Sequence, residues 1–174
     1  MSEKPEAWQR GPLPGVPPLL MPAAHAFVQV SEELVALVGL DEAQLWARPG
    51  GVASVGFHLR HIAGSTERLL TYARGEGLRE EQVRAARQDA DPPRPGESAS
   101  ALVAAARAGI ERALGQLRAT PEAALLEPRD VGRRRLPSTV LGLLFHAAEH
   151  AQRHCGQAAT TARIVRAGAR DAGA

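Results

Sequence analysis

Apolar side chains recur at helical spacing in four stretches of the chain, and segments rich in proline, glycine and charge separate these stretches. In the first stretch the apolar residues Phe27, Val30, Leu34 and Leu37 follow one another at intervals of three and four residues, which places them on one face of a helix. Alternating apolar and polar runs, which are typical of half-buried strands, are scarce. The pattern therefore predicts four helices, at residues 22–39, 54–74, 98–117 and 138–166.

Polar residues and glycines mark the expected ends of these helices. Ser54, Ser98 or Ser100, and Ser138 each stand directly before an apolar stretch, where a hydroxyl can accept a hydrogen bond from an unpaired backbone N–H. Glycines follow the stretches, as at Gly39, where a left-handed conformation ends a helix at little cost. Residues 41–46 have room for one further turn before the loop that Pro49-Gly50-Gly51 predicts.

The connections differ in length, and two of them are long. Residues 76–97 are charged and interrupted by prolines, so we expect an exposed crossover, and residues 121–137 are expected to form a second loop. The prolines of residues 1–18 predict a flexible extended arm, and residues 169–174 a flexible tail. The predicted fold class is all-α, a four-helix bundle with long crossover connections, in a single domain over residues 19–168.

Composition excludes several classes of function. The chain has 174 residues and a formal net charge of only +2, too small an excess to indicate nucleic-acid binding. Its early apolar stretch, residues 13–21, is broken by prolines and predicts neither a signal peptide nor a membrane span. Cys155 is the sole cysteine, which rules out an internal disulfide and fits a reducing cytoplasm.

Five of the six histidines fall in two of the predicted helices. His58 and His61 lie in the second, while His146, His150 and His154 follow one another at intervals of four in the last. A spacing of four residues puts two imidazoles on adjacent turns of one face, and a second helix can supply a third nitrogen. Several unpaired imidazoles in one core would be costly, so the pattern predicts a metal site.

A helical wheel ranks these histidines only in part. On the last helix His154 lies nearest the centre of the apolar face, His150 at its flank and His146 toward the polar side, so His150 and His154 form the better internal pair. On the second helix the wheel mildly favours His58 over His61. The choice between these two stays open at this point, because the geometry between the helices is unknown.

Other chemistry in the sequence is weaker. His146-Ala-Ala-Glu149-His150 matches the H-x-x-E-H arrangement of inverted zinc proteases, yet only Asp171 follows as a further carboxylate ligand. We therefore expect Glu149 to be a helix-surface group or an outer contact of the site. His25 and Cys155 are expected to be structural, and Arg133-Arg134-Arg135 could bind an anionic substrate but is more typical of a solvated surface.

Two motifs resemble a known family. Ser54-Val-Gly-Phe-His-Leu-Arg-His61-Ile-Ala-Gly-Ser65 and His150-Ala-Gln-Arg-His154-Cys-Gly-Gln157 are similar to segments of the DinB/YfiT-like proteins, and Leu45-Trp46-Ala-Arg-Pro49-Gly-Gly51 fits the usual lead-in to the second helix. The resemblance covers residues 22–167. It implies a four-helix bundle, often a homodimer, with a divalent metal bound by one histidine of the second helix and two of the last.

Carried over position by position, the resemblance implies His61, His150 and His154 as metal ligands and leaves the roles of His58 and His146 open. Cys155 stands at a position where members of the family often have Arg or another residue. Imidazole ligation suits several ions, of which zinc is expected first and nickel is an alternative. Some family members are stress-related proteins named for damage inducibility, without an assigned reaction. Others are thiol S-transferases that couple a low-molecular-weight thiol, such as bacillithiol, to a small-molecule electrophile.

The resemblance thus implies a metal-dependent transferase. Two alternatives remain: a metal-dependent hydrolase in which the ion activates water, and a non-catalytic bundle whose metal is structural. A requirement for added thiol separates the first two, and a fourth coordination position closed by His58 or His146 would favour the third.

Overall fold

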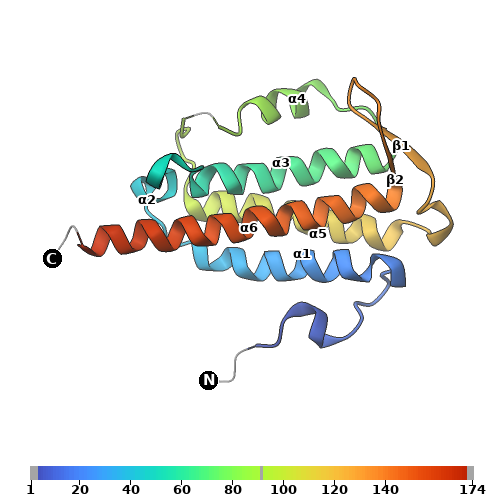
Figure 1. The fold of residues 1–174 in the computed structure, drawn as a ribbon, viewed down its shortest axis with the longest axis horizontal. Coiled ribbons are helices and arrows are strands. Elements are labelled where there is room, and N and C mark those ends of the chain that lie inside the picture. Colours follow the sequence, from blue (N-terminus) through green and yellow to red (C-terminus); the bar gives the residue numbers. More distant parts are fainter. Residues whose placement is uncertain (1–3, 91, 172–174) are drawn as a thin grey trace.

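Four long helices lie side by side in the computed structural model, which describes residues 4–90 and 92–171 (Figure 1). The helix α3 packs against α5 and α6, and α1 packs against the same two helices, so the four form a closed ring around one core. This arrangement confirms the predicted all-α bundle. The helices are α1 (Met21–Glu33), α3 (Val55–Ala73), α5 (Ala99–Ala119) and α6 (Val140–Asp171).

Side-chain caps fix where the helices begin. Ser54 Oγ accepts from Phe57 N at the start of α3, and Ser98, not Ser100, caps α5 in the same way. The short helix α2 (Glu42–Trp46) begins after Asp41, whose carboxylate accepts from Gln44 N. At α6 the prediction was one residue off, because Thr139 Oγ1, and not Ser138, accepts from Gly142 N.

The last helix is longer than its sequence predicts. Its backbone continues past Gly168 to Asp171, so the first residues of the predicted tail are helical, and residues 172–174 lie outside the described range. Two internal glycines, Gly142 and Gly156, do not interrupt it, since packing against α1 and α3 outweighs the modest helix penalty of glycine.

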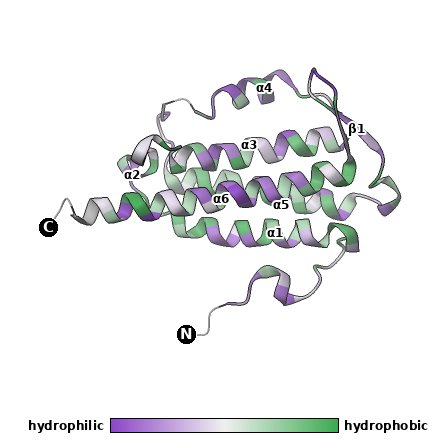
Figure 2. Ribbon diagram, in the orientation of Figure 1, coloured by the Kyte–Doolittle hydropathy of each residue, from purple (hydrophilic) through white to green (hydrophobic). Residues whose placement is uncertain are grey.

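The contact between α3 and α6 is an apolar seam with small side chains on the α6 side. Leu59 and Ile62 of α3 and Leu144 of α6 are fully buried. Alanines allow the two backbones to approach closely, because a methyl group takes little room between helices. Figure 2 shows hydrophilic colour in the middle of α6, where the histidines lie. The alanines buried along α6 are Ala147, Ala148, Ala151, Ala158 and Ala162.

The crossover from α3 to α5 contains a helix that the sequence analysis missed. Since α3 and α5 run in the same direction, residues 74–98 return along the length of the bundle, and α4 (Glu80–Arg87) lies over α3 on the outside (Figure 1). Most of the described residues of the crossover are exposed, as predicted, but the polar residues Gln82 and Asp89 are buried against α3. Gln82 Nε2 donates to Thr71 Oγ1 at 2.9 Å.

The connection from α5 to α6 was likewise predicted as a loop and contains a small hairpin. After a 3-10 turn at Glu122–Ala124, β1 (Pro128–Val131) pairs antiparallel with β2 (Leu136–Thr139), with Val131 opposite Leu136. Strands of four residues with mixed polarity give no alternating pattern to detect. The turn between them uses positive φ at Gly132 and at Arg135.

Residues 4–18 run along α1. Arg10 and Lys4 both pair with Glu32, Ala7 N donates to Gln29 Oε1, and the side chains of Ala7 and Val16 are buried. The segment includes two 3-10 turns, Ala7–Arg10 and Pro18–Leu20. Residues 1–3 lie outside the described range, and the flexibility of the arm and the domain boundaries stay predictions. None of the described helices is long and apolar enough to cross a membrane.

Candidate metal centre

Three histidines from α3 and α6 converge at the seam between these helices. His61, His150 and His154 each offer a ring nitrogen, and these three atoms lie within 4.8 Å of one another. All three residues are partly buried. The spacing of four residues on α6 produces this arrangement, because it stacks two imidazoles on adjacent turns opposite the one from α3. The structure therefore brings together the three residues that the sequence analysis singled out.

One ring nitrogen of each histidine faces a partner outside the group. His61 Nδ1 lies 2.8 Å from Asp89 Oδ2, His154 Nδ1 lies 2.9 Å from His58 Nδ1, and His150 Nδ1 lies 3.2 Å from an Arg153 nitrogen. This leaves the Nε2 atoms for the centre, and those of His61 and His150 are 2.9 Å apart. Outer contacts of this kind fix the orientation of metal-ligating imidazoles.

These contacts also determine the tautomers. The Asp89 carboxylate can only accept, so His61 donates through Nδ1 and its Nε2 carries a lone pair. Arg153 can only donate, so His150 Nδ1 accepts and the proton of His150 is on Nε2. This Nε2–H donates a hydrogen bond to His61 Nε2. To offer Nε2 to a metal, His150 must move its proton to Nδ1 and release Arg153.

The two remaining histidines stand outside the group. His58 is buried, with 5% of its surface exposed, and contacts His154 rather than the centre. The helical wheel thus predicted correctly that His58 is more buried than His61. However, it is His61, at the flank of the apolar face of α3, that faces His150 of α6. His146 is exposed, and its Nδ1 lies 3.6 Å from Glu149. Neither residue closes a fourth position of the three-histidine group.

Burial and nearby positive charge favour the neutral form of three histidines at the seam. The pKa values of His58, His150 and His154 are lowered to about 4, chiefly by burial and to a smaller extent by the charge of a protonated His61. Neutral imidazoles offer the lone pair that a metal ion requires. At pH 7 two members of the three-histidine group, His150 and His154, are therefore neutral, although His150 must still move its proton from Nε2 to Nδ1 before Nε2 can bind a metal.

Asp89 is a candidate site residue that the sequence analysis missed. It follows α4 in the crossover, is only 7% exposed, and contacts both His61 and the Arg68 guanidinium, whose Nη2 lies 3.5 Å from Asp89 Oδ2. Gly64 leaves room for this arrangement, since a Cβ there would stand 2.7 Å from Arg68 Nη1. A single aspartate in a charged, proline-broken segment carries no periodic signal that could have identified it.

The segment that carries Asp89 is held to α3 by Arg60. This buried guanidinium is paired with Glu97, donates to the carbonyl oxygens of Gln88 and Pro92, and lies over the Trp46 ring at 4.4 Å. Gly56 admits that ring, because a Cβ at Gly56 would lie 2.6 Å from a Trp46 carbon. The lead-in residues before α3 thus help to place the crossover over the histidines.

Other residues that the sequence analysis considered lie away from the centre. Cys155 is buried beside Glu33, and burial, with a smaller effect of that carboxylate, raises the pKa of its thiol to about 12, as expected for an inert cysteine. His25 Nε2 contacts the Gly11 carbonyl oxygen at 2.9 Å. Glu149 is bound by Arg153, whose hydrogen bond holds the pKa of that carboxyl below its usual range, so it is a surface group of α6.

The three nitrogens fit a divalent metal ion of borderline softness. Two ligands of a tetrahedral zinc ion with bonds of about 2.0 Å stand about 3.3 Å apart. The 2.9 Å between the Nε2 atoms of His61 and His150 is close to that value, and a small outward movement of either ring reaches it. The donor set is made of imidazoles only, which suits zinc, nickel, copper and iron.

A cavity of about 500 Å³ opens beside the centre. His61, His146 and His150 line it, together with Arg68, Arg87 and residues of α4. One side of the three-histidine group therefore faces space that a small molecule can enter. A purely structural site is typically closed by four protein ligands, whereas a catalytic one keeps a position open.

Comparison with known proteins agrees with this arrangement. No curated protein matches the chain. A sequence model described as the DinB superfamily matches residues 26–158, a stretch that includes both histidine motifs, α3 and α5 in full, and most of α1 and α6. Because this match spans well over half of the chain, the protein belongs to the DinB superfamily.

Proposed function

We propose that this protein is a divalent-metal-dependent enzyme of the thiol S-transferase type, in which His61, His150 and His154 hold the ion. The observation that carries the proposal is the convergence of three imidazoles beside an open cavity. Zinc is the first candidate for the ion, and nickel is the second. The substrates would be a low-molecular-weight thiol and a small electrophile.

The bound ion would lower the pKa of a coordinated thiol or water toward neutrality and so supply a nucleophile. The residues of the chain would hold and orient the ligands of the ion. Asp89 would hold His61 with Nε2 directed at the centre, and His58 would do the same for His154 by accepting from its Nδ1. The imidazole of His146 lies at the edge of the cavity and does not belong to the ligand group.

The open side distinguishes this proposal from a structural metal. A structural role would gain from a fourth protein ligand, yet His58 is turned to His154, and His146 is exposed. The cavity instead gives access to the centre from the side of α4. This access supports a catalytic role, in which the histidines position the ion and the groove selects the substrate.

The test begins with metal content. Elemental analysis of untagged protein is expected to give about one equivalent of metal, and none in a His61→Ala/His150→Ala/His154→Ala variant. The loaded protein is then assayed with 1-chloro-2,4-dinitrobenzene in the presence and absence of a thiol. Activity that requires the thiol supports the transferase, and hydrolytic activity without thiol favours the hydrolase. A protein that takes up no zinc or nickel refutes both.

A further inference from the structure

The cavity beside the histidines adjoins a larger one. A space of about 900 Å³ lies between α4, the loop after α3 and the β1–β2 hairpin. Tyr72, Leu78 and Val83 line both spaces, so the two cavities meet at these side chains, and we call them together the groove. Each part alone has the volume of a typical small-molecule site.

Two arginines line the part of the groove next to the histidines. None of the described residues that line it is acidic, but Arg68 is paired with Asp89, so Arg87 is the arginine there without an acidic partner in the described range. Within the described range Arg87 has no hydrogen bond or ion pair, and Nη1 of Arg68 is buried without a hydrogen-bond partner. The exposed guanidinium of Arg87, with all its donors unused, therefore favours an anion in this cavity.

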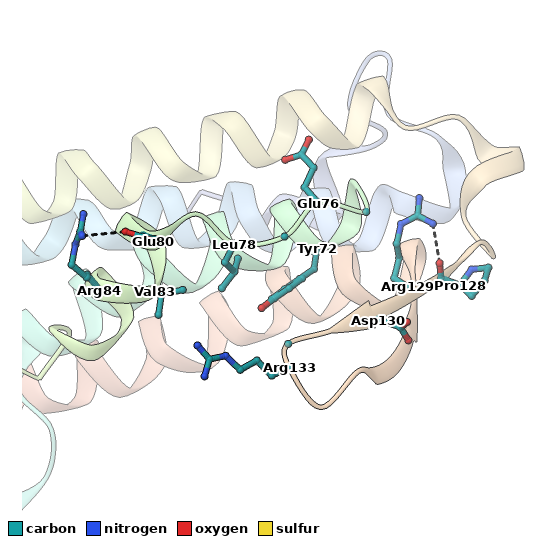
Figure 3. A pocket seen from close by; sticks show the side chains of 13 residues that line it. Tyr72, Glu76, Leu78, Glu80, Val83, Arg84, Pro128, Arg129, Asp130 and Arg133 are labelled. Atoms are coloured by element: carbon teal, nitrogen blue, oxygen red, sulfur yellow. Dashed lines mark hydrogen bonds and ion pairs between the residues drawn. The ribbon is translucent and has the colours of Figure 1, made fainter.

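The hairpin end of the groove is lined by both charges, and its acidic residues Glu76, Glu80 and Asp130 are each paired with an arginine, whereas Arg133 has unused donors. Figure 3 shows Arg133 reaching from the hairpin past Tyr72 toward α4. Neither Arg133 nor the Tyr72 hydroxyl has a hydrogen bond to another described residue, and the hydroxyl lies 3.9 Å from where a Cβ would stand at Gly132. By contrast, Arg129 is fully engaged, with bonds to Ala73, Pro128 and Glu127.

We propose that this groove, defined by Tyr72, Arg87 and Arg133, binds a carboxylate-bearing substrate whose reacting end lies at the histidines. A carboxylate near the histidines would be recognised by Arg87 and one at the hairpin end by Arg133, in each case through the planar guanidinium, and the apolar side chains of Leu78 and Val83 would cover the part between. The inference rests on the proposed function in placing the reacting end at His61 and His150. The carboxylate could belong to the thiol or to the electrophile.

The first arm of the test measures thiol binding without turnover. The protein is loaded with cobalt(II), and mercaptosuccinate and 2-mercaptoethanol are titrated while the near-ultraviolet band of the cobalt–thiolate pair is followed. If the carboxylate is on the thiol, mercaptosuccinate binds at least tenfold more tightly, and an Arg87→Gln/Arg133→Gln variant loses that preference. Arg134→Gln is the matched control, because Arg134 lies in the same turn and does not line the groove.

The second arm measures binding of the electrophile end. Calorimetry compares 4-nitrobenzoate with 4-nitrobenzamide on both metal-free and zinc-loaded protein. If the carboxylate is on the electrophile, the benzoate binds at least tenfold more tightly, and the same double variant abolishes the difference while Arg134→Gln preserves it.

The two arms together decide the proposal. A charge preference in either arm that the double variant erases supports the groove. Equal binding of charged and neutral probes in both arms, or a preference that survives in the double variant, overturns it. Failure of the protein to bind cobalt or zinc would instead overturn the proposed metal function, and the calorimetry on metal-free protein would still report on the groove.

Discussion

The seam between α3 and α6 and the crossover of residues 74–98 both contribute to the candidate centre, but different forces hold them. The seam is closed by fully buried apolar side chains such as Leu59, Ile62 and Leu144. The crossover covers the same helix α3 through a few buried polar contacts, from Gln82 to Thr71, from Asp89 to His61 and from Arg60 to the segment around Pro92.

This difference separates the ligands from the groups that tune them. Apolar burial is extensive and nearly independent of direction, so it sets the distance between α3 and α6 and with it the meeting of the three histidines. Polar contacts are directional, so the crossover sets which way His61 points and what lies over the cavity. Loss of an apolar side chain in the seam should therefore affect stability, whereas loss of a ligand or of a polar contact from the crossover should affect metal affinity.

The largest effect is expected from removing a ligand on the seam. His154→Ala takes away one of the three nitrogens, and metal affinity should fall by more than the roughly 100-fold that loss of an outer contact costs. Competition titration with a chelating dye measures this. His146→Ala is the control, because His146 lies outside the group, and equal losses in the two variants would contradict the assignment.

A cavity in the seam should come next. Leu144→Ala empties a fully buried position of α6, and the free energy of unfolding should fall by about 2–5 kcal/mol. Urea unfolding of metal-free protein measures the change. Leu126→Ala, at a position that is 77% exposed, should change stability by less than about 0.5 kcal/mol, and a comparable loss there would show that burial does not explain the difference.

A change in the crossover should reduce affinity while leaving the fold intact. Asp89→Asn keeps the shape of the side chain but removes the charge that faces His61, so metal affinity should fall by about 10- to 100-fold. The melting temperature of metal-free protein is recorded in parallel. Glu81→Gln, an exposed position of α4, should leave affinity unchanged, and a variant of Asp89 that retains full affinity would refute its positioning role.

The smallest effect, and the only gain, is expected at Arg153. This side chain donates to His150 Nδ1 and so keeps the proton on the nitrogen that a metal needs. Arg153→Met should therefore raise metal affinity by roughly threefold to tenfold, the value of one modest hydrogen bond. Arg163→Met, an exposed position further along α6, serves as the comparison, and weaker binding in Arg153→Met would contradict the tautomer assignment.

Much of the fold and part of the centre could be predicted because helical periodicity is a local property. The caps at Ser54 and Ser98, the lengths of α3 and α5 and the pairing of His150 with His154 all follow from spacing along one helix. The choice between His58 and His61 does not, because it depends on how α3 is rotated against α6. The family resemblance named His61, and the structure places it in the group.

The two connections show where local patterns fail. The helix α4 has too few apolar positions to stand out, and the hairpin strands are four residues long, so neither gives a periodic signal. The proposed roles of Asp89 and Arg133 depend on their neighbours in the fold, since Asp89 contacts His61 and Arg133 lines the groove. A sequence pattern can mark Arg133 as one of three adjacent arginines, but it cannot say that Arg133 alone of the three lines the groove.

The sequence by itself determined an all-α bundle, with most of its helix boundaries, and two helices that carry imidazoles at metal-binding intervals, because helix formation and capping depend on neighbours within a few residues. Only the tertiary structure decided that His61 meets His150 and His154, that Asp89 and His58 stand behind them, and that a groove lined by arginines leads to the hairpin. Those relations join residues tens of positions apart, and the packing of α3, α6 and the crossover sets them.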